Sequence, residues 1–371
     1  MALNTIPNPG LTKRGFPTAR VANPLIINGG FEVSQRVGTT ATSFVNNTYG
    51  LDRWKHYLAG SCALNYQQLG QASSIVTNLQ STSGINYTNC LYLDCTTAAS
   101  LGATDQLSVL QLMEGYVHNP LAGKVMTLSF WVRSNVTGTY CIAFKEGSTK
   151  TYVVEYTISS ADTWEQKILT LTDDTLANYN TNTSVTTGSS LEVHFTTRLG
   201  TTAQQTTADA WNTGNFYGTS NQVTWGTSTS DVFYLAAVQL EVGEFNSTTL
   251  PAFAFESFGA NLARCQRYLE FSSDYGATYT SGVNSCVIMD MTSGSHPLYF
   301  PISYNTYKRA APTMTFYNGN DGATGTWRTN ASTDVSISGT SISSQGFTTN
   351  SSDLGGDGRS SNGTWKAESE L

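Results

Sequence analysis

Residues Val125–Arg133 read VMTLSFWVR, an alternation of apolar side chains with side chains that are mostly polar. Successive side chains of a β-strand point to opposite faces, so this stretch predicts a strand with one continuous apolar face. That face comprises Met126, Leu128, Phe130 and Val132. A strand that is apolar on one face only has to pack against a second sheet, which predicts a β-sandwich.

Further strands are expected after this stretch, separated by Gly, Asn and Thr turns. They are residues 140–145, 151–158, 164–171, 191–197 and 232–242. The last of these is apolar at both parities, so it is expected to be a central strand covered on both faces. Charged residues make up only 12% of the chain, against about 25% in ordinary globular proteins, which also favours strands over helices.

The pattern divides the chain into four parts. Residues 1–24 hold four prolines and no apolar period, so an extended arm is expected there. Residues 25–250 form the expected sandwich, and residues 251–271 a connecting helix with Ser257 as its N-cap. Residues 272–371 return to alternation and predict a small C-terminal β domain. The expected fold class is therefore all-β, with one short helix between the sandwich and the C-terminal domain.

Composition excludes several classes of partner. The formal net charge is −7 and the 19 Lys and Arg are scattered, which argues against nucleic acid. No apolar run is long enough to span a bilayer, and the N-terminus lacks the pattern of a signal peptide. The six cysteines are expected to be buried free thiols, as in a protein made in a reducing cytoplasm. They are Cys62, Cys90, Cys95, Cys141, Cys265 and Cys286.

Five short motifs over about 220 residues resemble the jelly-roll carbohydrate-binding modules. They are Asn28–Glu32, Asp52–Trp54, Leu128–Arg133, Thr163–Glu165, and Phe233–Leu235 followed by Val238–Leu240. The resemblance implies a jelly-roll sandwich, often with a structural calcium ion held by the first motif and an acid in the last strand. Here the last strand carries Ala236 and Ala237, so Glu32 is the one calcium candidate and we expect no resident metal or other cofactor.

A second resemblance is to tail-fibre and virion structural proteins of tailed bacteriophages. It starts with Val238–Gly243, Phe255–Glu256 and Arg264–Tyr268, and continues with Phe300–Ile302, Arg309–Thr313 and Trp365–Leu371. It implies a homotrimer on the exterior of the phage particle, made in the bacterial cytoplasm. Lys13, Arg14 and Arg20 of the arm suit an acidic surface, so we expect the arm to attach the protein to another tail or capsid protein.

No motif of catalysis stands out. The acids show no spacing that marks a catalytic pair, the four histidines lie far apart, and no nucleophile elbow, phosphate loop or metal motif occurs. We expect a protein that is not an enzyme. A glycan depolymerase of the tailspike kind is disfavoured because no repeat of fixed period is present.

The candidate ligand site is the loop region 200–230, rich in Thr, Asn and Gly. It carries Trp211, Phe216, Tyr217 and Trp225, whose rings could stack on sugars or could instead anchor the loop to the sandwich. An alternative binding cluster in the C-terminal domain comprises Tyr304, Tyr307, Tyr317 and Trp327. The sequence thus predicts a receptor-binding subunit that recognises host-surface glycan. The alternative is a capsid-decorating or tail-attached structural protein without a receptor role.

Overall fold

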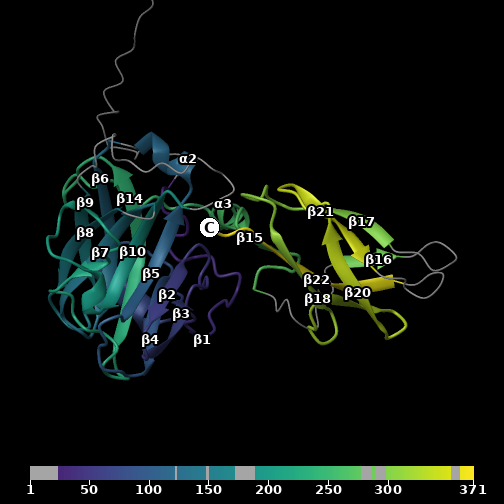
Figure 1. The fold of residues 1–371 in the computed structure, drawn as a ribbon, viewed down its shortest axis with the longest axis horizontal. Helices are drawn as coiled ribbons and strands as arrows, with labels where there is room; N and C mark the ends of the chain where they lie inside the picture. Colours follow the sequence, from purple (N-terminus) through teal and green to yellow (C-terminus); the bar gives the residue numbers. More distant parts are fainter. Residues whose placement is uncertain are drawn as a thin grey trace, which may run out of the picture.

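Two six-stranded antiparallel sheets face each other in the larger lobe of the protein (Figure 1). The computed structural model describes residues 24–121, 123–147, 150–171, 189–276, 286–289, 298–351 and 360–371. The first sheet has the order β1 (Thr42–Ser43), β3 (Ala63–Leu69), β4 (Cys90–Thr97), β14 (Val232–Val242), β6 (Met126–Ser134) and β9 (Glu165–Leu171). The second has the order β12 (Trp211–Thr213), β8 (Lys150–Ile158), β7 (Gly138–Glu146), β10 (Leu191–Leu199), β5 (Gln106–Met113) and β2 (Lys55–Ala59). The predicted all-β jelly-roll sandwich is confirmed.

The core between the sheets follows the predicted parity. In β6 the side chains of Met126, Leu128, Phe130 and Val132 are all buried in it. Strand β14 lies between β4 and β6 and is buried along nearly its whole length, as predicted for a central strand. Phe233 and Leu235 face the core, while Tyr234 and Ala236 face a second apolar cluster on the outer side of the sheet.

That outer cluster is covered by a helix that the sequence pattern did not predict, α1 (Ser74–Ser83). Ser73 accepts a hydrogen bond from the Ile75 amide as N-cap, and Gly84 ends the helix in the left-handed conformation. Its buried residues Val76 and Leu79 pack in the outer cluster. A second unpredicted helix, α2 (Gly115–His118), follows β5 and continues into the 3-10 turn η1 (Asn119–Leu121).

The smaller lobe in Figure 1 is a second β unit built around its last strand, β22 (Ser360–Glu368). Four strands pair with β22: β15 (Leu269–Phe271), β16 (Cys286–Met289), β18 (Thr313–Asn318) and β19 (Thr326–Thr329). Strands β20 (Asp334–Thr340), β21 (Gly346–Ser351) and β17 (Leu298–Ser303) extend the sheet from β19 to its edge. Its buried cluster holds Phe316, Trp327, Phe347 and Trp365, so this unit has a separate core.

The connecting helix α3 spans Phe258–Gln266 and is shorter than the predicted range 251–271. The side chain of Ser257 accepts a hydrogen bond from the Ala260 amide, which confirms the predicted N-cap. Leu269, which lies within the range predicted for the helix, belongs instead to β15 and pairs with Glu368 of β22. Its burial therefore comes from sheet packing, which spacing alone does not distinguish from a helical stripe.

Three further expectations concern the cysteines, the N-terminal arm and membrane-spanning segments. Cys62, Cys90, Cys95, Cys141 and Cys265 are buried free thiols, as expected, whereas the side chain of Cys286 lies outside the described residues. The same holds for residues 1–23 of the arm, including Lys13, Arg14 and Arg20. No helix in the described part of the chain is long and apolar enough to cross a membrane.

The two β units meet at a buried polar junction. The side chain of Arg53, only 1% exposed, forms an ion pair with Glu370 and donates to the carbonyl of Leu112 at 2.7 Å. Its guanidinium lies 3.5 Å from the centre of the Tyr268 ring, a cation–π contact. Arg36 binds Glu370 as well, at 3.1 Å. The segment after β22 is thereby held against the sandwich.

A second contact of the same junction involves Glu114, at the start of α2. Its carboxylate accepts hydrogen bonds from Nε and Nη2 of Arg267, both at 3.1 Å, and from the hydroxyl of Tyr268. Gln35 adds a contact from its side-chain amide to the carbonyl of Leu269 at 2.9 Å. The junction therefore joins the first turns of the sandwich, α2, the end of α3 and the last residues of the chain.

Removing one partner of this network leaves a buried charge without compensation. We expect Glu370→Gln to lower the free energy of unfolding by about 3–5 kcal/mol, because Arg53 keeps its charge in a dry site. The matched control is Glu244→Gln, an exposed position at which we expect a change below about 0.5 kcal/mol. Urea unfolding of both variants measures the difference. Equal stability of Glu370→Gln and wild type would show that the junction contributes little.

Candidate functional site

The structure separates the four aromatic residues predicted for the ligand loop. Trp225 is fully buried in the core of the sandwich, so its indole offers no face to a ligand. Its backbone is held from both sides, since its amide donates to the Thr197 carbonyl and its carbonyl accepts from Arg198 at 3.0 Å. Trp225 therefore anchors the loop to the sandwich, which is the alternative to stacking on a sugar. Val223 packs against the same core, so the loop reaches the core near Trp225 without the alternation that marks a strand.

Trp211 lies at the open edge of the sandwich. It pairs with Tyr152 across β12 and β8, and the two ring centres are 5.6 Å apart. Residues opposite each other in antiparallel strands point to the same face, and Tyr152 belongs to the core. Trp211 is partly buried against that core, so it closes the edge of the sandwich and does not stand beside Phe216 and Tyr217.

Phe216 and Tyr217 lie on the outward face of the second sheet. Phe216 packs on Cys141, Ala143 and Val153 and covers the middle of that face. Next to Phe216 along the chain, residues 218–219 (β13) pair with β11 (Gln204–Gln205). Strand β11 directly follows the 3-10 turn η2 (Thr201–Ala203). The loop thus folds back over the sheet; His194 of β10 is buried, whereas Tyr57 of the edge strand β2 remains exposed.

We use the name tyrosine patch for the group of side chains on this face that comprises Tyr57, Lys145, Glu192, His194 and Tyr217. Tyr57 is 37% exposed, and its ring is nearly parallel to that of Tyr217, with centres 6.3 Å apart and 19° between the planes. The His194 ring lies against Tyr217 at 4.8 Å. An exposed phenol ring beside a partly buried one, next to charged and hydrogen-bonding groups, forms a surface suited to a sugar ring.

The polar side of the patch is a charged group of three residues. Glu192 binds Nε2 of His194 at 2.9 Å and Nζ of Lys145 at 3.5 Å. Burial alone would raise the pKa of Glu192, but the hydrogen bond and charge of His194, with Lys145, lower it to about 2. Burial next to Glu192 and Tyr57 raises the pKa of Tyr217, so its phenol stays protonated and remains a hydrogen-bond donor.

The alternative cluster of the C-terminal domain does not form one surface. Trp327 and Tyr304 belong to the core of the second β unit, and Tyr317 is also buried. Tyr307 alone is open, with 64% of its surface exposed. Its neighbours in the sequence-based cluster are therefore packing residues, and a single exposed tyrosine makes a weaker platform than the paired rings of the tyrosine patch.

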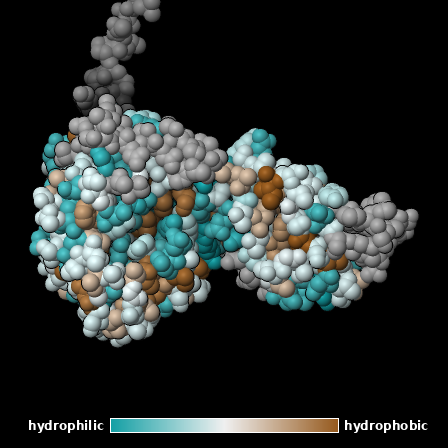
Figure 2. Space-filling view, viewed as in Figure 1, coloured by the Kyte–Doolittle hydropathy of each residue, from teal (hydrophilic) through white to brown (hydrophobic). Residues whose placement is uncertain are grey.

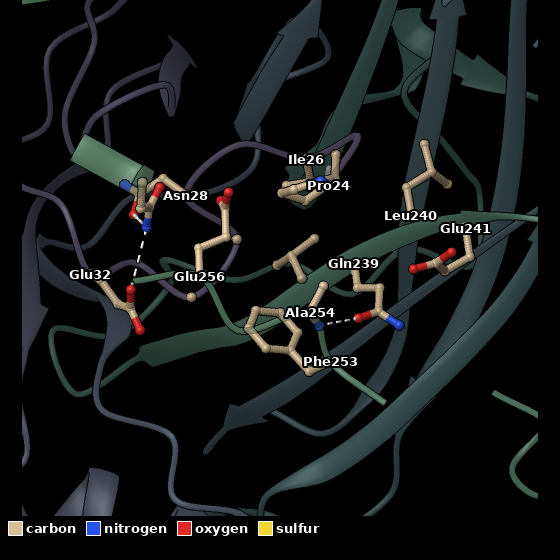
Figure 3. A pocket seen from close by; sticks show the side chains of 14 residues that line it. Pro24, Ile26, Asn28, Glu32, Gln239, Leu240, Glu241, Phe253, Ala254 and Glu256 are labelled. Atoms are coloured by element: carbon tan, nitrogen blue, oxygen red, sulfur yellow. Dashed lines mark hydrogen bonds between the residues drawn. The ribbon is translucent and has the colours of Figure 1, made fainter. Parts of the chain in front are cut away.

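Glu32, the calcium candidate, lines a small pocket of about 30 Å³ between β14 and the start of α3 (Figure 3). Its carboxylate accepts hydrogen bonds from Thr88 at 3.3 Å and Asn261 at 3.4 Å. In Figure 3 the carboxylate of Glu256 lies near Glu32, whereas Glu241 lies at the other end of the pocket. Within the described ranges, no three or more His, Cys, Asp or Glu side chains are arranged to hold a metal ion.

The first motif shapes this pocket through its backbone. Asn28 and Phe31 have positive φ angles of 57° and 56°, and the carbonyl of Gly29 accepts the Val238 amide at 2.9 Å. A Cβ on Gly29 would lie 2.0 Å from the Val238 oxygen, so only glycine allows this approach. Phe31 then stacks on Trp54 at 4.8 Å, which brings the first two motifs together.

Sequence reasoning did not identify Tyr57, because strand β2 was not among the predicted strands and the candidate site was placed in the long loop. The usable signal was the alternation in Lys55–Leu58, which puts Lys55 and Tyr57 on one face. His194 is a buried strand residue whose Nε2 is hydrogen-bonded to Glu192. Its proximity to Tyr217 depends on how residues 200–217 fold back, which no local pattern predicts.

No family model matches the sequence, and no curated protein matches it either. Solved structures with a similar fold include the enzymatically active domain of tailspike protein 4 from bacteriophage CBA120, with 12% identity and a TM-score of 0.29. That match covers 59% of this chain and 21% of the tailspike chain. The family 11 carbohydrate-binding module of a cellulosomal cellulase from Clostridium thermocellum has 12% identity and a TM-score of 0.27, covering 57% of this chain and 98% of the module.

A third similar structure is the module TmCBM61 in complex with β-1,4-galactotriose, with 10% identity and a TM-score of 0.29. It covers 60% of this chain and 100% of the module. These likenesses concern the fold, and none of them assigns a ligand or a role to this chain.

The low pKa of Glu192 predicts a pH dependence. A carboxylate whose pKa falls on folding stabilises the protein above its unfolded value of 4.5, and this contribution is lost as pH falls towards about 2. Over that interval it amounts to about 3 kcal/mol. We therefore expect Glu192→Gln to be less stable than wild type at pH 7, with a difference that shrinks as pH falls below 4.5. Thermal unfolding at several pH values measures it; a difference independent of pH would refute the assignment.

Proposed function

We propose that this protein is a virion surface subunit of a tailed phage that recognises host-surface glycan through the tyrosine patch. It acts by binding, without catalysis, on the exterior of the particle. The virion role is supported by the fibre-like motifs Val238–Gly243, Arg264–Tyr268 and Trp365–Leu371. The glycan role is supported by the geometry of the patch.

The observation that carries the glycan role is the pair of nearly parallel rings of Tyr57 and Tyr217. Apolar faces of sugar rings stack on aromatic rings, while their hydroxyl groups need donors and acceptors close by. Lys145 supplies a donor and Glu192 an acceptor at the edge of the patch, and each retains 15% exposure of its side chain. Two nearly parallel aromatic rings bordered by polar groups of both kinds are matched to a neutral or weakly charged saccharide.

Pre-organisation favours the same interpretation. His194 and Glu192 sit on β10, in the middle of the second sheet, and are hydrogen-bonded to each other before any ligand arrives. Tyr217 is held by its amide, which donates to the Ala203 carbonyl at 3.0 Å. Groups that are already fixed lose little entropy on binding.

The proposal predicts that removing either ring weakens adhesion. Tyr57→Ala and Tyr217→Ala should each weaken binding to host cells and to polysaccharide extracted from them by about five- to a hundredfold. This corresponds to about 1–3 kcal/mol, by analogy with bases stacked on aromatic side chains. The matched control is Tyr307→Ala, which removes an exposed ring from the second β unit. Surface plasmon resonance on immobilised polysaccharide gives the affinities.

Tyr57→Ala is the cleaner variant because Tyr57 is more exposed than Tyr217 and supports no loop. Thermal unfolding shows whether each variant keeps its fold. Unchanged affinity in both patch variants would rule out the patch, and loss of binding in Tyr307→Ala alone would move the site to the second β unit. Wild-type protein that binds neither cells nor polysaccharide would favour a structural subunit without a receptor role. Release of reducing sugar would favour a depolymerase.

The fibre-like motifs also lead us to propose a homotrimer, attached through residues 1–24 to another tail or capsid protein. Light scattering on the full-length chain at micromolar concentrations should give three times the 40.0 kDa of a single chain. A monomer at every concentration would contradict the proposed assembly, while leaving the glycan test above unaffected.

A further inference from the structure

A cavity of about 460 Å³ lies between α2 and α3, next to the junction of the two β units. Its size falls in the range of about 300–1,000 Å³ that is typical of ligand sites, and domain interfaces are a common place for them. In Figure 1, α2 lies on the larger lobe and α3 between the lobes. The five residues of the tyrosine patch lie outside the described lining, so the two sites are separate.

Most of the described wall of this cavity is apolar. Three segments supply the apolar side chains: the first residues of the sandwich, the end of β5, and α2 with the turn that follows it. These side chains include Leu25, Ile27, Leu112, Met113, Val117 and Leu121. An apolar molecule gains free energy by leaving water for such a wall, because the transfer of apolar surface out of water is favourable.

The two arginines that line the cavity are each paired with a carboxylate. Nε of Arg267 lies 3.1 Å from the carboxylate of Glu114, whose side chain is 2% exposed. Nε of Arg264 lies 2.7 Å from the carboxylate of Glu256, whose side chain is 7% exposed. Each pair carries no net charge, so the described lining has no excess charge of either sign to hold a charged ligand.

The other polar side chains of the described lining are engaged as well. The hydroxyl groups of Tyr116 and Tyr268 both donate to Glu114, at 3.3 Å for Tyr116. The side-chain amide of Gln111 donates to the carbonyl of Ile27 at 2.8 Å and accepts from its amide at 2.7 Å. These groups use their hydrogen-bonding capacity on the protein itself, so water or a polar ligand in the cavity finds few partners.

We propose that this cavity binds a small neutral molecule with an apolar chain, which lies along the wall between α2 and α3. A charged head would have to leave water without a counter-ion, since the arginines and the carboxylates already neutralise each other. A short polar molecule would gain little from the apolar wall. The site is independent of glycan recognition by the tyrosine patch.

The test uses the full chain as the protein and octan-1-ol as the probe. Octanoate has the same body with a charged head, and butan-1-ol has the same head on a shorter body. By isothermal titration calorimetry at pH 7, octan-1-ol should bind at least about ten times more tightly than either. The charge of octanoate finds no partner, and each CH₂ group that is removed weakens binding about fourfold.

Two outcomes of this titration contradict the proposal. Octanoate or butan-1-ol binding as tightly as octan-1-ol would show that the apolar wall and the paired charges do not select the ligand. No binding of octan-1-ol, as expected if another chain fills the cavity, would overturn the proposal as well.

A filled cavity locates the binding. Val117→Phe places a larger side chain in the cavity and should weaken octan-1-ol binding by at least about tenfold. The matched control is Val45→Phe, the same change at a position that is 54% exposed and lies outside the described lining. Thermal unfolding shows whether each variant folds, and Leu25→Trp fills the cavity from another segment if Val117→Phe does not. Equal octan-1-ol affinity in a folded, filled variant and in Val45→Phe would overturn the proposed site.

Discussion

Arg53 is a buried cation whose charge is neutralised by a carboxylate from the far end of the sequence, and the arrangement of both β units depends on this contact. Its backbone has a φ of 71°, unusual for a side chain with a Cβ, which aims the guanidinium away from the sandwich core and towards Tyr268 and Glu370. A buried cation is tolerated only with such partners. The conformation of the first turns of the sandwich is therefore stabilised by the last residues of the chain.

The junction and the outward face of the second sheet present two kinds of surface. Near the junction the arginines face carboxylates: Arg53 and Arg36 bind Glu370, and Arg267 binds Glu114. On the outward face of the second sheet, Phe216 and Tyr217 pack over the middle, and Tyr57 beside Tyr217 remains exposed. Figure 2 shows hydrophobic side chains grouped in places on a surface that is otherwise mainly polar. In the proposed function, recognition depends on two tyrosine rings next to the charged residues Lys145 and Glu192.

Much of the fold could be predicted from the local sequence pattern, but the candidate site could not. The parity of residues 125–133 and the two-sided apolar character of residues 232–242 predicted the core, because strand burial has a period of two. Helix α1 escaped prediction because Ser and Thr, which are weak helix formers, fill much of it, and packing on the outer sheet face stabilises it. Trp225 and Tyr217 lie eight positions apart in one loop, yet one enters the core and the other faces outward. Loop direction is set by tertiary contacts, such as Arg198 with the Trp225 carbonyl, that spacing does not encode.

The central claim is that the tyrosine patch is the surface that meets the host. The most direct measurement is a crystal structure of the full chain with an oligosaccharide fragment of the host-surface polysaccharide. We expect density for a sugar ring against Tyr57 and Tyr217, with hydroxyl groups within hydrogen-bond distance of Lys145 or Glu192. A fragment bound at full occupancy elsewhere, for example beside Tyr307, with the patch empty, would contradict the account.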